Sequence, residues 1–202
     1  NLPASFAQFV PVTVTSQGRT GTFWVSPMPL SIGTDAAPFH APLSAPAAQR
    51  IADHYGHSLP TKKMVDAIHE AANVRVPFKS YSADRQSPRT FVASSDVIEA
   101  RRAGRTGLVS DFAKDYVITN QRRSNPARIA IFGGWDAQGG LVQPFAVPHA
   151  LTYYDYSQQP RFVAGSVLVD GVVMPLAAAL ADPATAHLFS HEGPITGAML
   201  RY

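Results

Sequence analysis

The sequence has 202 residues, of which 46% are hydrophobic and only 15% are charged, with a net charge of +3 and no cysteine. This length is enough to bury one sizeable hydrophobic core, and the lack of cysteine excludes disulfides, thiolate nucleophiles and cysteine-ligated zinc. The low charged fraction and the 17 prolines indicate a loop-rich chain and favour a secreted or periplasmic bacterial protein. Since a membrane-spanning helix needs roughly 20 apolar residues in a row and no stretch comes close, we expect no membrane span.

The first half of the sequence predicts a strand pair followed by helices. Residues 6–16 alternate aromatic or β-branched residues with polar ones, as a half-buried strand does, and 21–27 is the expected partner strand across a turn. Capping residues and apolar stripes at helical spacing then predict helices. These helices cover residues 44–56, 59–73 and 94–104. Between the last two, residues 74–90 begin as a strand and continue as a polar loop, which we interpret as either mobile or placed over a cleft.

The second half predicts mainly strands and ends in helices. Strands are expected over 107–120, 128–135, 141–147, 151–156 and 161–170. Asp170 and Gly171 are a typical hairpin turn, and the last two helices are expected over 175–182 and 183–193. We therefore predict one α+β domain over residues 1–202, with helices from the first half and the C-terminus packed on a largely antiparallel sheet.

Residues 147–162 hold the densest group of side chains that can move protons or bind a polar ligand. On a strand, alternate side chains share one face, which here groups Leu151, Tyr153, Asp155 and Ser157, and also His149 if the strand starts early enough. Our preferred hypothesis is catalysis, with His149 as the acid or base, Asp155 as its orienting carboxylate, and Tyr153 and Tyr156 as proton donors or binding groups.

Two other interpretations of this segment remain open. Asp155 and Arg161 could form a salt bridge inside a core tyrosine cluster without any catalytic role. A Ser157–His149–Asp155 triad is disfavoured, because no glycine-flanked turn surrounds the serine.

Other segments add candidate binding residues. Lys114 and Asp115 lead into an apolar strand, where the acid could ligate a metal, orient His149 or cap a turn. Trp135 stands at a predicted hairpin mouth, either as a platform for a sugar or peptide or as a core anchor. His187 and His191 are four residues apart, but Leu188 occupies the position at which a zinc protease has glutamate; we therefore predict no metal.

The sequence does not contain the phosphate-binding or dinucleotide-binding glycine motifs, so we predict no cofactor. Arginines cluster at 101–105 and 121–128. Because the net charge is small, we interpret them as solvated loop charges and predict no nucleic-acid partner.

Several segments resemble a family of uncharacterised bacterial proteins, namely "LPTKKMVDAI" (59–68), "DYVITN" (115–120), "RIAIFGGW" (128–135), "PHALTYYDYSQQPRFV" (148–163) and "LADPATAHLFSHEGPI" (180–195). The family pattern contains H-G-x-x-Y-x-D-Y-S-H-G-I-R-L-V. The resemblance implies that the polar residues matching the pattern are functional: Lys114, Asp115, His149, Tyr153, Asp155, Tyr156, Ser157 and Arg161. Ala150 replaces the first glycine of the pattern, and Gln158 replaces its second histidine.

These observations lead to one functional prediction and one alternative. We predict a hydrolase that acts on a polymer such as a cell-wall glycan or peptide, or on a small-molecule substrate. In addition to the catalytic residues, Arg161, Lys114, Asp115, Ser157 and Trp135 are the predicted substrate-binding residues. The alternative is a non-catalytic module that binds cell-wall polymer or a partner protein through the same tyrosines.

Overall fold

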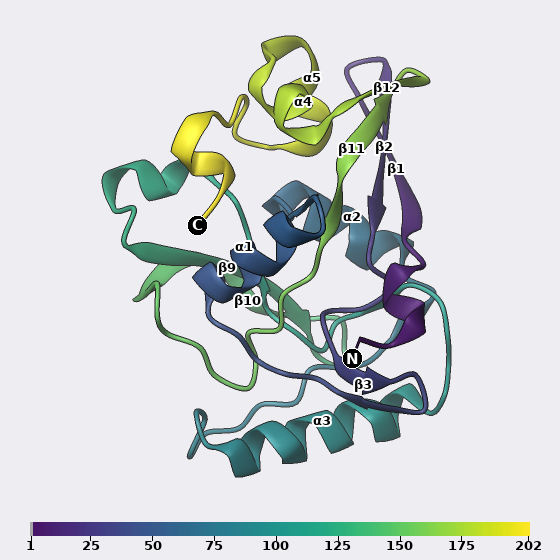
Figure 1. Cartoon of the computed structure of the whole chain (residues 1–202), viewed down its shortest axis with the longest axis vertical. Helices are drawn as coiled ribbons and strands as arrows, with labels where there is room; N and C mark the ends of the chain where they lie inside the picture. Colours follow the sequence, from purple (N-terminus) through teal and green to yellow (C-terminus); the bar gives the residue numbers. More distant parts are fainter. Residues whose placement is uncertain (1) are drawn as a thin grey trace.

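The computed structural model describes residues 2–202. As predicted, the chain is α+β, and its largest sheet is antiparallel in the order β1-β2-β11-β12 (Figure 1). The strands of this sheet are β1 (Val10–Ser16), β2 (Arg19–Val25), β11 (Val163–Val169) and β12 (Val172–Pro175), and the short β5 (His57–Ser58) also pairs with β11. Strands from both ends of the sequence therefore lie side by side.

Two tight turns set the register of this sheet. Gln17 and Gly18 join β1 to β2, and Asp170 and Gly171 join β11 to β12, with φ between 48° and 83° at all four residues. Positive φ at both turn residues matches the twist of the flanking strands, which is why Asp-Gly is favoured here. The predicted hairpin at Asp170 is thus confirmed, as is the pairing of the first two strands.

A second antiparallel sheet has the order β10-β9-β8. It contains β8 (Asp115–Tyr116), β9 (Arg128–Trp135) and β10 (Leu141–Ala150). Two small pairs complete the strands: the hairpin β3 (Ile32–Thr34) with β4 (Ala37–Phe39), and the parallel pair β6 (Val74–Arg75) with β7 (Val109–Ser110).

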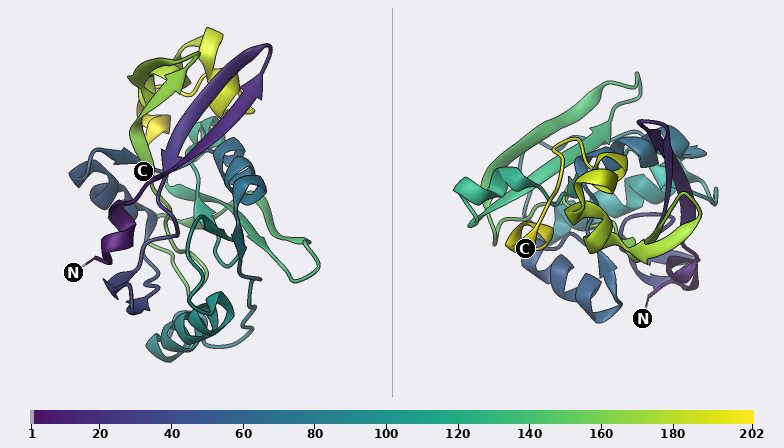
Figure 2. Two further views of the ribbon diagram at one scale, coloured as in Figure 1. Left: turned by 90° about the vertical axis from the view of Figure 1, so that its right-hand side faces the viewer. Right: turned by 90° about the horizontal axis from the view of Figure 1, so that it is seen from above.

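The helices are α1 (Ala45–His54), α2 (Lys62–Ala71), α3 (Pro88–Arg102), α4 (Leu176–Ala181) and α5 (Pro183–Phe189), with 3-10 turns η1 (Ala4–Ala7), η2 (Asn120–Ser124) and η3 (Gly197–Leu200). Helix α2 contacts both β1 and β9 and so connects the two sheets. Helices α4 and α5 cover the strands of the large sheet at one end of the molecule, and α3 lies at the opposite end (Figures 1 and 2).

Local chemistry explains the helix starts. Thr61 accepts a hydrogen bond from the N–H of Met64 and caps α2, as expected. Helix α3 begins earlier than predicted, because Ser87 caps it through the N–H of Thr90 and Pro88 occupies its first turn. No helix in the described chain, residues 2–202, combines the length and the apolar character needed to span a bilayer.

The predicted strand over 151–156 is wrong. Residues 151–162 form turns and extended loop between β10 and β11. The predicted strand over 107–120 is likewise reduced to two short pieces, β7 and β8. The main core lies between the large sheet and helices α1, α2, α4 and α5, and includes Phe23, Met64, Phe162 and Phe189.

Candidate functional site

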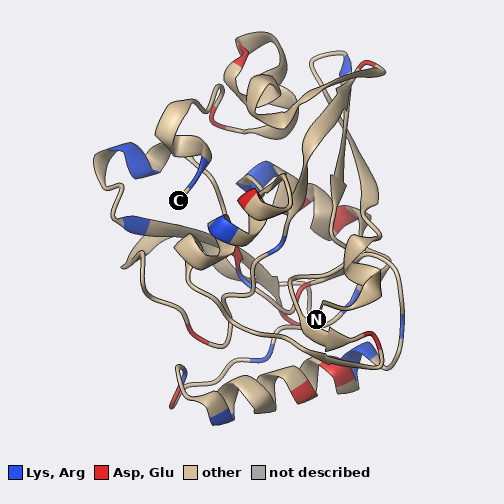
Figure 3. Cartoon of the chain, in the orientation of Figure 1, with Lys and Arg blue, Asp and Glu red and all other residues tan. Residues whose placement is uncertain are grey.

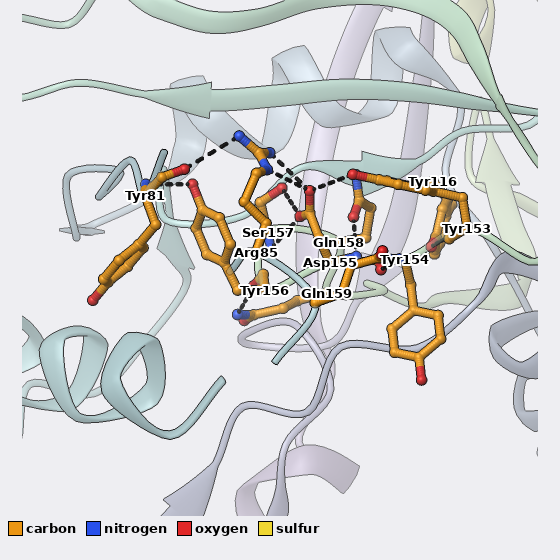
Figure 4. Close-up of polar contacts among 11 residues, drawn as sticks. Tyr81, Arg85, Tyr116, Tyr153, Tyr154, Asp155, Tyr156, Ser157, Gln158 and Gln159 are labelled. Atoms are coloured by element: carbon orange, nitrogen blue, oxygen red, sulfur yellow. Dashed lines mark hydrogen bonds and ion pairs between the residues drawn. The ribbon is translucent and has the colours of Figure 1, made fainter. Parts of the chain in front are cut away.

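The carboxylate of Asp155 lies at the centre of a network of polar side chains (Figure 4). Ser157 donates its backbone N–H at 2.9 Å and its hydroxyl at 2.6 Å to Oδ1. Arg85 donates to Oδ2 through Nε at 2.9 Å and Nη2 at 2.8 Å, and the Tyr153 hydroxyl donates to the same oxygen at 2.9 Å. Both oxygens of this 0% exposed residue are therefore fully hydrogen-bonded.

These donors keep Asp155 charged. Burial opposes ionisation, but the hydrogen bonds from Ser157, Arg85 and Tyr153 outweigh it and hold the pKa of Asp155 below its ordinary value. Because every lone pair is occupied, the carboxylate is not positioned to take a proton from a substrate. What it does instead is hold Arg85 and Tyr153 in fixed positions.

Tyr153 connects this buried carboxylate to the surface. Together with Arg85 it lines an open hollow of about 500 Å³, and the other lining residues are Ser82, Asp84, Gln86 and Ser87. Burial and the hydrogen bond to Asp155 raise the pKa of the Tyr153 hydroxyl. The phenol is therefore protonated at neutral pH with its proton donated to Asp155, so its oxygen is free to accept a hydrogen bond rather than to donate one.

His149, at the end of β10, lies against Tyr153. The two rings are stacked, with centroids 3.9 Å apart and an interplanar angle of 19°. Burial lowers the pKa of His149, and the positive charges of Lys114, Arg85 and Arg128 lower it further against the opposing attraction of Asp155. The half-buried imidazole is thus neutral at pH 7 and able to accept a proton.

The hydrogen bond predicted between His149 and Asp155 is not formed. Among residues 2–202, the donors to the Asp155 side chain are Ser157, Arg85 and Tyr153. Tyr153 links His149 and Asp155 instead, because its ring stacks on the imidazole and its hydroxyl donates to the carboxylate.

Lys114 adds a second cation to this group. Its backbone N–H donates to the Ser157 carbonyl at 2.8 Å, which fixes residue 114 beside the Asp155 loop. Burial and the nearby charge of Arg85 lower the pKa of the lysine ammonium. Its Nζ lies 5.6 Å from the centre of the Phe78 ring, and its positive charge, like that of Arg85, acts on the neutral imidazole.

Three neighbours of Asp155, namely Tyr156, Ser157 and Gln158, use their side chains in contacts within the chain. Tyr156 is buried and its hydroxyl accepts the N–H of Tyr81 at 2.9 Å. Ser157 is also buried and is fully used in binding Asp155. Gln158, which replaces the histidine of the family pattern, accepts the backbone N–H of Asp155 at 2.6 Å.

Arg161 and Asp115 lie in the interior, away from the hollow. Arg161 donates to the carbonyls of Ser26 at 3.0 Å and Val109 at 2.6 Å, so the salt bridge with Asp155 that was left open as an alternative is not formed. Burial raises the pKa of Asp115 to about 7, although the charge of Arg161 opposes this shift. Within residues 2–202, Oδ1 of Asp115 has no hydrogen-bond partner.

Trp135 is 7% exposed and does not offer the open platform that its hairpin position suggested. The ring of His69 covers it, with centroids 3.9 Å apart and planes within 6°. Sequence reasoning also missed Arg85, the charged partner of Asp155, because it lies in the loop over 74–90, which has no clear pattern. The one signal available in the sequence was a positively charged residue in a polar loop, which could pair with Asp155, the single acid of residues 147–162.

Most arginines of the two clusters form hydrogen bonds or ion pairs with other residues of the chain. Arg101 donates to the Pro77 carbonyl, Arg102 pairs with Glu99, and Arg122 donates to backbone carbonyls. Lys and Arg positions are distributed over several elements (Figure 3). In the described part of the chain, no three His, Cys, Asp or Glu side chains come together as metal ligands; His191 instead lies 3.5 Å from Asp66.

No protein-family model matches the sequence, and neither the curated proteins nor the solved structures contain a significant match. The resemblance to a bacterial family therefore stays a prediction, and the functional argument depends on the site itself.

Proposed function

We propose that the chain is a secreted or periplasmic bacterial hydrolase that cleaves a polymer such as a cell-wall glycan or peptide. Its catalytic surface would consist of His149, Tyr153, Arg85 and Lys114. The observation that carries this proposal is the stacking of a neutral imidazole on a tyrosine whose hydroxyl proton is donated to a buried carboxylate.

In the proposed mechanism, His149 is the general base. A water molecule beside the stacked rings donates one hydrogen bond to the imidazole and another to the Tyr153 oxygen, which accepts it because its own proton is bound to Asp155. As the water attacks the scissile carbon, its proton passes to His149, which then returns a proton to the leaving group. Asp155 does not exchange protons in this scheme and acts by positioning.

The charges of the site favour a substrate with an acidic group. Arg85 and Lys114 give two positive charges, of which Asp155 neutralises one. Cell-wall peptides and acidic glycans carry carboxylates that a guanidinium or an ammonium can bind. The same cations would stabilise negative charge that develops on the attacked group.

The alternative is a non-catalytic module that binds the same polymer. The saturated carboxylate of Asp155 favours it, because His149 then has no carboxylate of its own to stabilise the imidazolium. In a binding module, His149, Tyr153 and Arg85 would hold the ligand without cleaving it.

Digestion of purified peptidoglycan sacculi tests both functions. The hydrolase proposal expects soluble fragments, and analysis of new reducing ends against new amino groups identifies a glycan or a peptide bond as the target. His149→Gln should release fragments about 100-fold more slowly, while His54→Gln, at the end of α1, should match the wild type. Sedimentation of the intact chain with undigested sacculi would support the binding module and overturn the hydrolase.

A further inference from the structure

A second histidine–aspartate pair lies outside the site described above. Nδ1 of His69, near the end of α2, is 2.7 Å from Oδ1 of Asp111. Nη1 of Arg75 lies 2.7 Å from Nδ1 and 3.1 Å from Nε2 of the same ring. Because a ring nitrogen that donates to a carboxylate cannot also accept from a guanidinium, the consistent arrangement has Nδ1–H donating to Asp111 and Nε2 accepting from Arg75.

The backbone of Asp111 is held in an unfavourable conformation. Its φ is +89°, in a region that favours glycine, and its side chain is only 6% exposed. The Trp135 N–H donates to the Asp111 carbonyl at 3.0 Å and so fixes this turn. Strain of this kind is concentrated at functional sites, and here it brings a buried carboxylate to a histidine at the surface.

The imidazole of His69 is fixed in two directions. Asp111 holds the Nδ1 edge, and the stacked ring of Trp135 holds one face. Arg75, which contacts Nε2, is 44% exposed and can exchange that contact for water. The Nε2 lone pair is therefore the side of the ring that can reach a ligand.

His69 lines a groove of about 640 Å³ between α2 and β1. Its other lining residues include Lys63, Asp66, Glu70, Trp135 and His191. The carboxylates of Asp66, Glu70 and Asp111 are offset by the positive charges of Lys63 and Arg75, so the groove and its rim carry little net charge and fit an uncharged reacting group. This preference differs from that of the Arg85–Lys114 site.

We propose that this groove is a second catalytic site, in which His69, positioned by Asp111, is the general base for hydrolysis of an uncharged carboxylic ester. Nε2 takes a proton from a water molecule as the water oxygen bonds to the acyl carbon. The bond from the acyl carbon to the alkoxy oxygen then breaks, and the proton on Nε2 passes to that oxygen or, for an acidic leaving group, to solvent. The products are the acid and the alcohol, and no oxidant or metal is required.

Hydrolysis of p-nitrophenyl acetate by the purified chain tests the proposal. We expect a rate above that of an equal concentration of free imidazole, and a loss of about 100-fold in His69→Gln. Asp111→Gly should remain folded, because glycine accepts the positive φ, and yet lose a similar factor. His54→Gln, at the exposed end of α1 and outside both sites, should stay within two-fold of wild type.

Two further measurements distinguish a catalytic His69 from a merely structural His69–Asp111 pair, and this groove from the site around His149. Imidazole ¹⁵N spectra should show His69 with Nδ1 protonated in the wild type and a changed tautomer ratio in Asp111→Asn, which a packing role alone would not require. Ester hydrolysis is also measured in His149→Gln, because a loss of rate there would assign the reaction to the first site. The inference is overturned if His69→Gln retains the rate of His54→Gln, if Asp111→Gly retains activity, or if the rate is lost in His149→Gln instead.

Discussion

Tyr153 donates its hydroxyl proton to Asp155 at 2.9 Å while its ring face supports His149 at 3.9 Å. One tyrosine thus contacts both a buried carboxylate that stays ionised and a half-buried imidazole that can titrate. The arrangement makes Asp155 a structural anchor, and the mechanism proposed above assigns proton transfer to His149.

The pKa of His149 should lie below its ordinary value of about 6.5. Burial and the charges of Lys114 and Arg85 favour the neutral ring, so Lys114→Met should raise the pKa and Asp155→Asn should lower it. NMR titration of the imidazole C2 proton measures each value directly. A wild-type pKa above 7, or an unchanged value in Lys114→Met, would contradict the proposed environment.

Asp155→Asn should destabilise the chain by about 3 kcal/mol at pH 7, because an amide replaces a charged acceptor of several hydrogen bonds. The pKa of Asp155 is lowered in the folded state, so its stabilisation is present above the unfolded value near 4 and is lost as the pH falls through the folded value. The difference in unfolding free energy between the wild type and Asp155→Asn, measured by urea unfolding, should therefore be smaller at pH 3 than at pH 7. Asp96→Asn, on the exposed side of α3, serves as the control.

Asp115 should give the opposite pH dependence. Burial raises its pKa in the folded state from 3.8 to about 7, so the folded chain holds a proton that the unfolded chain releases. This group therefore contributes a loss of stability of about 1.4 kcal/mol per pH unit as the pH rises from 4 to 7. Asp115→Asn should remove that contribution, and an unchanged slope between these pH values in urea unfolding would show that Asp115 ionises normally.

Two adjacent arginines should differ in their effect on stability. Arg122 is buried and donates to the carbonyls of Pro126, Arg128 and Arg201, whereas Arg123 is exposed and bonds to side chains at the surface. Arg122→Ala should cost about 3 kcal/mol, since it removes a buried side chain together with its three hydrogen bonds to backbone carbonyls, and Arg123→Ala about 0.5 kcal/mol or less. Equal changes in the unfolding temperature of the two variants would show that the hydrogen bonds of Arg122 do not stabilise the chain.

Short-range signals predicted much of the fold. The turn at Asp170–Gly171, the cap at Thr61 and the first strand pair depend on a few neighbouring residues, and all are confirmed. The strand expected over 151–156 failed because its alternating pattern reflects contacts with Asp155 rather than a pleated strand. Tyr153 and Ser157 do meet Asp155, as the alternation suggested, but they do so in a loop.

Contacts between distant residues could not be predicted in this way. Arg85 reaches Asp155 across 70 positions, and His69 reaches Asp111 across 42. The positive φ of Asp111 is also invisible in the sequence, because aspartate gives no glycine-like signal. The sequence therefore pointed to the segment around Asp155, while the partners of this residue and the contacts of Arg161, Tyr156 and Trp135 required the structure.

The most direct test of the central claim compares Tyr153→Phe with Tyr154→Phe. Tyr153 carries the hydroxyl that joins Asp155 to the hollow, and its neighbour Tyr154 is exposed. The rate at which each variant releases soluble fragments from peptidoglycan sacculi should fall about 100-fold for Tyr153→Phe and stay within two-fold of wild type for Tyr154→Phe. Equal rates for the two variants would contradict a working role for the Tyr153–Asp155 pair.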